Sequence, residues 1–490
     1  MLPGVQRLTA FEENYDSEEK VPEYLRELEV QDDELGVLVV PRIKTFDLDS
    51  GSCTHHHHDH LPAHTKSFRA GATTHTSPTS SSTVSHIPRS KSLLLGRHAS
   101  VLQAVPSSSV EVVEVVAEQS WLVTKLTFQL LWALRMSHRW ILCALRLVWF
   151  VIFLLPAFLR ICYYVLTDEN LHKNIIYGLK GRNLLDVYMV PRGRKLSASE
   201  LQRERHPVVV FLSGGAWIIG YKCWGALMGK VLSSFGIVVV TPDYRNFPQG
   251  IVPDMVEDAT LAMQWVFDNI HLFGGDPENV TFIGQSAGAH IAMCVLLEQA
   301  DKQLNDSTCS GMSSSSSFIS PPTWTLRQVR SVIGISGPYN IEACVEAFHH
   351  HGFDRGVVER IMDQRLAYYS PALRFPAKSE KSVAQRRLEN FPPVFLFHGT
   401  SDKTVNWKST EQFAHALESC GVAVKTQYFE GKTHTDPIIE DPICGDDFLL
   451  QEIIAILKER SPRDAQGEFK PKPRYYPKIL MKLARKVNPF

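Results

Sequence analysis

From about residue 180 onward, short runs rich in Val, Ile and Phe alternate with stretches whose apolar residues recur at helical spacing. The apolar runs are HPVVVFLSGG at 206–215, GIVVVTPDY at 236–244, NVTFIG at 279–284, VRSVIGISG at 329–337, PPVFLFHG at 392–399 and AVKTQYFEG at 423–431. The helical stretches lie at 253–275, 287–300 and 447–460. Because continuous apolar strands need cover on both faces, this order predicts an α/β fold in which helices flank a mostly parallel sheet. We assign residues 171–465 to this folded domain.

The first 115 residues have a different composition. They hold an acidic stretch, a histidine run, CTHHHHDH at 53–60, and a Ser/Thr-rich tract. Few apolar residues recur there with a regular period, so little surface can be buried to offset the entropy of ordering, and we expect residues 1–115 to be disordered. The histidine run has two interpretations, a transition-metal site or a flexible tract with no specific ligand, and the second is more common. No metal or other cofactor is therefore expected.

Residues 116–170 contain two apolar segments. The first, WLVTKLTFQLLWAL at 121–134, is predicted to be a second membrane span or an interfacial helix. The second, at 140–166, exceeds the roughly 20 apolar residues that cross a bilayer and is predicted to be a transmembrane helix. Arg146 and Arg160 interrupt it, and their side chains are expected to reach the interface. The alternative is a buried or amphipathic helix that packs on the folded domain.

The motif GQSAG at 284–288 lies between a strand pattern and a helical pattern. G-x-S-x-G alone is a weak signal, but a nucleophilic serine on a strained strand-to-helix turn needs small neighbours. Gly284 and Gly288 supply that space, and Ser286 would lie at a helix N-terminus, which favours negative charge. The sequence therefore predicts Ser286 as a nucleophile, and the simpler alternative is a helix-capping serine.

A glycine pair follows the strand pattern HPVVVFL directly, in SGGAW at 213–217. Glycines let the backbone approach a substrate carbonyl closely. The backbone N–H groups of Gly214, Gly215 and Ala216, with that of Ala287, are predicted to hold the oxyanion of a tetrahedral intermediate. The alternative is an ordinary glycine-rich turn.

Asp402 and His434 each follow the end of a later strand, in HGTSDKTV and GKTHTD. The chain order Ser, Asp, His is the order of α/β-hydrolases. We therefore predict a catalytic triad in which Ser286 attacks an ester carbonyl, His434 is the general base and Asp402 orients the imidazole. Asp436 is the nearest rival acid, but it lies only two residues from the histidine and away from a strand end.

Longer stretches resemble one known family. The runs SGGAWIIGYKCWG, DYRNFPQG, FGGDP, GQSAGAHI, LFHGTSDKTV and GKTHTD are similar to those of the plant isoprenylcysteine α-carbonyl methylesterases, and the resemblance covers roughly residues 165–490. It implies an α/β-hydrolase fold and hydrolysis of the methyl ester on a C-terminal farnesylated or geranylgeranylated cysteine, with release of methanol. The residues that it carries over are Ser286, Asp402 and His434, with Gly214, Gly215, Ala216, Gln285 and Ala287 lining the oxyanion and substrate site.

The resemblance also implies partners and a location. Members of this family are typically membrane proteins of the endoplasmic reticulum and Golgi. Their substrates would be prenylated and carboxymethylated proteins of the small-GTPase kind, which implies a catalytic domain facing the cytosol. A prenyl group needs an apolar channel, and Trp217, Trp224 and Phe247 follow strand ends where such a channel would begin. Their alternative role is as core aromatics.

Two other functions stay open, a broader membrane carboxylesterase or lipase and a catalytically silent binding protein on a hydrolase fold. Lys plus Arg total 51 and Asp plus Glu total 52, so the charge balance gives no reason to expect a nucleic-acid partner. Residues 301–325 are expected to form a flexible loop, and 341–391 a partly helical cap. The basic tail 466–490 is expected either to lie on an anionic membrane or to pack on the domain.

Overall fold

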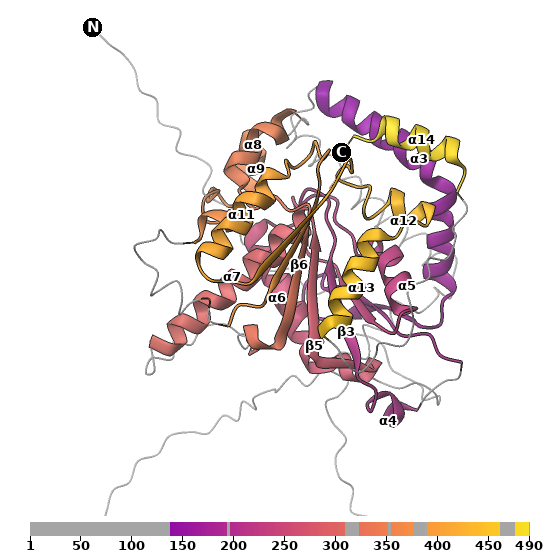
Figure 1. Ribbon diagram of the computed structural model, residues 1–490, viewed down its shortest axis with the longest axis vertical. Helices are drawn as coiled ribbons and strands as arrows, with labels where there is room; N and C mark the ends of the chain where they lie inside the picture. Colours follow the sequence, from indigo (N-terminus) through magenta and orange to yellow (C-terminus); the bar gives the residue numbers. More distant parts are fainter. Residues whose placement is uncertain are drawn as a thin grey trace, which may run out of the picture. The chain divides into compact units, whose positions relative to one another are not determined.

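The computed structural model describes residues 138–193, 197–308, 323–350, 354–375, 388, 390–460 and 476–489. They include one eight-stranded sheet in the order β1-β2-β4-β3-β5-β6-β7-β8. Figure 1 shows this sheet with helices beside it. The strands are β1 (Leu171–Ile176), β2 (Leu184–Tyr188), β3 (His206–Leu212), β4 (Val238–Pro242), β5 (Gly275–Gln285), β6 (Val329–Ile335), β7 (Val394–Gly399) and β8 (Val424–Phe429). Both pairings of β2 are antiparallel and the remaining pairings are parallel. The predicted α/β fold with a mostly parallel sheet is confirmed.

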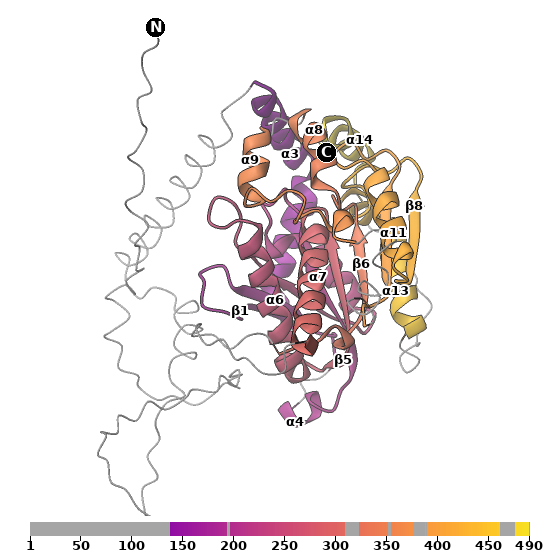
Figure 2. The ribbon, with the colours of Figure 1, turned by 90° about the vertical axis from the view of Figure 1, so that its left-hand side faces the viewer.

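Helices cover both faces of this sheet. The described helices are α3 (His138–Thr167), α4 (Ala198–Leu201), α5 (Ala226–Ser233), α6 (Val252–Asn269), α7 (Ala287–Thr308), α8 (Ile341–His350), α9 (Arg355–Ile361), α11 (Lys408–Ser419), α12 (Glu440–Cys444), α13 (Phe448–Arg460) and α14 (Lys478–Val487). Figure 2 looks onto the face covered by α6 and α7, and α5 and α13 pack on the opposite face.

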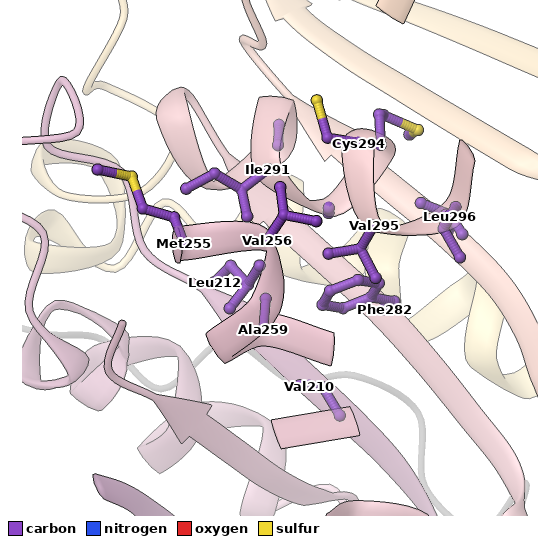
Figure 3. Close-up of a cluster of buried hydrophobic side chains, with 14 of the residues drawn as sticks. Val210, Leu212, Met255, Val256, Ala259, Phe282, Ile291, Cys294, Val295 and Leu296 are labelled. Atoms are coloured by element: carbon purple, nitrogen blue, oxygen red, sulfur yellow. The ribbon is translucent and has the colours of Figure 1, made fainter. Parts of the chain in front are cut away.

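The alternating direction of strand side chains explains the two covered faces. In β3, Val208, Val210 and Leu212 join the core cluster under α6 and α7, whereas Val209 and Phe211 join the cluster under α5 and α13. All five are buried, as expected for a strand in the middle of a parallel sheet. Figure 3 shows Val210 and Leu212 together with side chains from α6 and α7 in the first cluster.

The two antiparallel strands at one edge were not predicted. β1 reads LHKNII and leaves three consecutive side chains exposed, so it lacks the apolar run that marks the central strands. The prediction of a flexible loop at 301–325 is wrong at its start, because α7 continues to Thr308. Residues 309–322 lie outside the described part of the chain. The predicted disordered region 1–115 and the first apolar segment, 121–134, also lie outside it.

One described helix, α3, is long and apolar enough over Ile141–Thr167 to cross a membrane by length and composition. The guanidinium of Arg146 on this helix donates to the backbone carbonyls of Val487 and Asn488, at 3.3 and 3.0 Å. These carbonyls lie at the C-terminal end of α14, where unpaired acceptors favour a cation. The expected reach of Arg146 to a membrane interface stays a prediction.

The basic tail packs on the body, which was one of its two predicted roles. Met481 and Ala484 of α14 are buried against Phe150 and Leu154 of α3. Figure 1 shows α14 alongside α3 at the edge of the sheet domain. Asn488, just beyond α14, is buried and donates to Glu440 on α12 and to Thr435, each at 2.7 Å.

Arg245 holds the loop after β4 to α6. Its guanidinium and backbone N–H donate to Asp258, which is fully buried, and the guanidinium also pairs with Asp254 and Glu257. We expect Arg245→Met to lower the free energy of unfolding by about 3 kcal/mol, because it leaves a buried carboxylate without its cation. Urea unfolding of the variant measures this. Arg355→Met removes an exposed ion pair with Glu359 and should change nothing; equal stability of both variants would contradict the prediction.

Candidate active site

Ser286 lies on the turn between β5 and α7, and its φ of 53° places it in the left-handed region. The turn is crowded. A Cβ at Gly288 would come within 2.2 Å of the Leu212 carbonyl oxygen, so only glycine fits there. The backbone N–H of Ser286 donates to the Ile335 carbonyl at 2.8 Å, which fixes the turn to the neighbouring strand β6. The sequence motif thus has the strained local geometry expected of it.

His434 links Ser286 to Asp402. Its Nε2 lies 2.9 Å from Ser286 Oγ and its Nδ1 lies 2.6 Å from Asp402 Oδ2. All three side chains are buried. Asp402 follows β7 and His434 follows β8, and the C-terminal ends of parallel strands meet at one edge of a sheet. The structure therefore brings the three predicted residues into one hydrogen-bonded chain.

Several groups hold Asp402 as a carboxylate. Its Oδ1 accepts from the backbone N–H groups of Thr404 and Val405, each at 2.9 Å, and its Oδ2 lies 3.0 Å from His398 Nε2. Burial opposes the charge, but the imidazoles of His434 and His398 outweigh it and hold the pKa of Asp402 well below its usual value.

His398 was not predicted as part of the site. The histidine of HGTSD, at the end of β7, was a visible signal for it. Its Nδ1 lies 2.7 Å from Thr410 Oγ1, so the ring is fixed at both nitrogens. The rival acid, Asp436, faces elsewhere, since it accepts from Thr433 and pairs with Arg485 at 3.1 Å.

The predicted oxyanion residues surround Ser286. Gly214, Gly215, Ala216, Gln285 and Ala287 line the same cavity as Ser286 and His434. Gly215 has a φ of 134° and Ala216 a φ of 52°, so the loop after β3 is folded sharply back. A Cβ at Gly214 would lie 2.2 Å from the Gln285 side-chain oxygen, which explains the close approach of this loop to the nucleophile turn.

Trp217 fixes the end of this loop through a residue that was not predicted. Its indole N–H donates to His290 Nδ1 at 3.2 Å, and His290 Nε2 lies 2.6 Å from the Tyr369 carbonyl oxygen. Burial lowers the pKa of His290 to about 4, so the ring is neutral at pH 7, with Nε2 as the donor. His290 lies one turn after Ser286 on α7, and so it ties the loop after β3 to α7.

The cavity beside Ser286 has a volume of about 300 Å³ and an apolar lining. Trp217 and Trp224 line it, as predicted for an apolar channel. Trp217 and Phe247 both belong to the core of the domain, which was the alternative role. Phe348 of α8 and Ile361 of α9 also line it, so the described part of the 341–391 insertion caps the site. Among the described residues no group of His, Cys, Asp and Glu is placed to hold a metal ion, and the histidine run at 53–60 lies outside them.

A serine hydroxyl on a strained turn, an imidazole and a carboxylate at the C-terminal edge of this sheet define a serine hydrolase of the α/β-hydrolase class. Comparison with known proteins agrees. A protein-family profile described as BD-FAE matches residues 196–417. The chain is 37% identical to isoprenylcysteine alpha-carbonyl methylesterase ICME of Arabidopsis thaliana, over 76% of this chain and 83% of that protein. It is 38% identical to the probable enzyme of the same name in Oryza sativa subsp. japonica, over 76% and 85%.

The chain therefore belongs to the isoprenylcysteine α-carbonyl methylesterase family. Among solved structures, a thermophilic esterase from Thermogutta terrifontis is 22% identical, and the match covers 61% of this chain and 96% of that one with a TM-score of 0.44.

The charge on Asp402 should contribute to stability in a defined pH range. The pKa of its carboxyl is lower in the folded chain than the value of about 3.9 expected on unfolding. The unfolded state therefore takes up the proton first as the pH falls, and the stabilisation is present above about pH 4 and lost below it. We expect the difference in unfolding free energy between the native chain and Asp402→Asn to shrink from pH 6 to pH 3. Urea unfolding at several pH values measures it, and a constant difference would refute the assignment.

Proposed function

We propose that this chain hydrolyses the methyl ester of a C-terminal prenylcysteine in proteins, releasing methanol, with Ser286 as nucleophile, His434 as general base and Asp402 as the acid that orients it. The observation that carries this proposal is the hydrogen-bonded chain of these three side chains, which opens on an apolar cavity. The relatives' name gives the ester class, and the apolar cavity suits the lipid part of such a substrate.

The mechanism follows from the geometry. As Ser286 Oγ attacks the ester carbonyl, its proton passes to His434 Nε2, 2.9 Å away. Asp402 keeps Nδ1 protonated and stabilises the imidazolium. The tetrahedral intermediate then expels the methoxy group, which takes the proton from His434 and leaves as methanol. Water attacks the acyl-enzyme in the same manner, giving the free carboxylate of the prenylcysteine and restoring Ser286.

The backbone around the turn would stabilise the developing oxyanion. The N–H groups of Gly214, Gly215, Ala216 and Ala287 are the proposed donors, and each such donor is worth about 3 kcal/mol in a transition state. The amide of Ser286 itself is engaged with Ile335 and is not part of this set. The side chain of Gln285 packs beside Gly214, between the two loops.

The substrates that we propose are prenylated, carboxymethylated proteins of the small-GTPase kind. Such proteins carry their lipid on a cytosolic C-terminus, so we place the catalytic domain on the cytosolic side of endoplasmic reticulum and Golgi membranes. The apolar helix α3 supports attachment to a membrane. A tethered enzyme meets lipidated tails at a high local concentration without any new contact.

A comparison of substrates on the purified full chain tests the proposal. We expect a much higher kcat/KM for a farnesylcysteine methyl ester than for the unprenylated cysteine methyl ester, and Ser286→Ala should lower kcat by a factor of about 10⁶ for the prenylated ester. A fluorophosphonate should label Ser286 in the native chain and not in the variant.

Other results would favour the other functions. Equal rates on the two esters would indicate a broader carboxylesterase. Failure of the fluorophosphonate to label Ser286 would indicate a silent binding protein. Turnover retained by a correctly folded Ser286→Ala variant would refute the mechanism.

A further inference from the structure

The apolar helix α3 forms part of the wall of the cavity that holds Ser286. The α3 side chains that line this cavity are Cys143, Ala144, Leu147, Phe150, Val151 and Phe158. They recur at intervals of three to four residues or a multiple of them, and so they lie on one side of the helix. The segment that hydropathy marks as a membrane helix is therefore also part of the substrate site.

The opposite side of α3 is exposed and apolar. The side chains of Leu142, Leu145, Trp149 and Ile152 are 57%, 52%, 52% and 46% exposed, respectively. Ile479 of the neighbouring α14 is 70% exposed, and Lys478, Lys482 and Lys486 on the same helix are also exposed. An apolar surface flanked by lysines is the pattern of a helix pair that lies on an anionic lipid surface.

Contacts along the length of α3 determine how it can meet a bilayer. Leu154 is buried against α12 and α14, Phe158 contacts Trp224 with ring centroids 6.4 Å apart, and Tyr164 stacks on Tyr188 of β2 at 6.5 Å. At 30 residues the helix is about 45 Å long. A helix that crossed the bilayer would carry these contacts, and the polar domain behind them, into hydrocarbon, at a high cost in free energy.

We propose that α3 lies along the bilayer surface, with its outer side in lipid and its inner side against the prenyl chain of the substrate, which passes from the bilayer into the cavity beside Ser286. The occupant of the cavity is the prenyl chain because the lining is apolar and continuous with the nucleophile. The occupant of the outer side is lipid because aromatic and aliphatic side chains are exposed there, and α14, which packs on α3, exposes three lysines. This inference rests on the proposed function.

Two adjacent residues of similar shape lie on opposite sides of α3. Val151 lines the cavity and Ile152 is exposed on the outer side. We expect Val151→Trp to lower the ratio of kcat/KM for a farnesylcysteine methyl ester to kcat/KM for p-nitrophenyl acetate at least tenfold, mainly through KM, since the indole would occupy the space of the prenyl chain. Ile152→Trp, the matched control, should leave the ratio unchanged. Both are assayed as full chains in detergent micelles.

The rate of fluorophosphonate labelling at Ser286 reports whether each variant is folded. If Val151→Trp does not fold, Ala144→Phe, two turns earlier on the cavity side, replaces it. An unchanged ratio in a folded variant, or an equal fall in both Trp variants, would overturn the inference. If the native chain shows no preference for the prenylated ester, the proposed function itself fails, and that result is obtained before any α3 variant is compared.

The depth of α3 side chains in a lipid bilayer tests the proposed orientation of the helix. A fluorescent amino acid is introduced by amber suppression at Leu142, Leu145, Trp149 or Ile152, in the full chain on vesicles of phosphatidylcholine and phosphatidylserine with lipids brominated at known depths. These positions span about 15 Å of helix axis. We expect similar, shallow depths within roughly 10 Å of the headgroup boundary. Depths that change by 10 Å or more from Leu142 to Ile152, or no quenching at all, would contradict the orientation.

Discussion

The hydrogen bond between His434 Nε2 and Ser286 Oγ joins two loops that lie 148 residues apart in the chain. It forms only if β5 and β8, separated in the sheet by β6 and β7, end at the same edge and in register. The parallel pairings supply that condition, and the buried side chains on both faces hold the strands in place. The geometry of the nucleophile is therefore a property of the whole sheet and not of the motif alone.

The C-terminal end of the chain is connected to the same site. Thr435, which follows His434, donates to Glu440 at 2.9 Å, and Asn488 donates to both Thr435 and Glu440. Burial raises the pKa of Glu440 to about 7. Thr435 and Asn488 both donate to its Oε1. Arg146 on α3 donates to the backbone carbonyl of Asn488 at 3.0 Å. The helices α3 and α14 and the loop of His434 are thus joined by hydrogen bonds and do not form separate modules.

The sequence alone predicts the parts of the site that depend on local pattern. The turn at Ser286 and the strand ends before Asp402 and His434 are each marked by a few adjacent residues, and the chain order completes the triad. The structure places these three together. His398 lies four residues from Asp402 and was overlooked although the run HGTSD contains it. His290 was missed because its partners, Trp217 and Tyr369, are distant in the chain and are brought close only by folding. The edge strand β1 was missed for a related reason, since its mostly exposed side chains carry no apolar run and its pairing with β2 defines it.

The case of α3 shows why hydropathy cannot separate a helix that crosses a bilayer from one that lies on it. A crossing helix is apolar on every side because lipid surrounds it. α3 is apolar on two opposite sides for different reasons, since one side lines an apolar cavity and the other is exposed. A sliding window averages the two sides and gives the same value for both arrangements. Only the contacts made along the helix distinguish them, and those of Leu154, Phe158 and Tyr164 hold the second half of α3 against the domain.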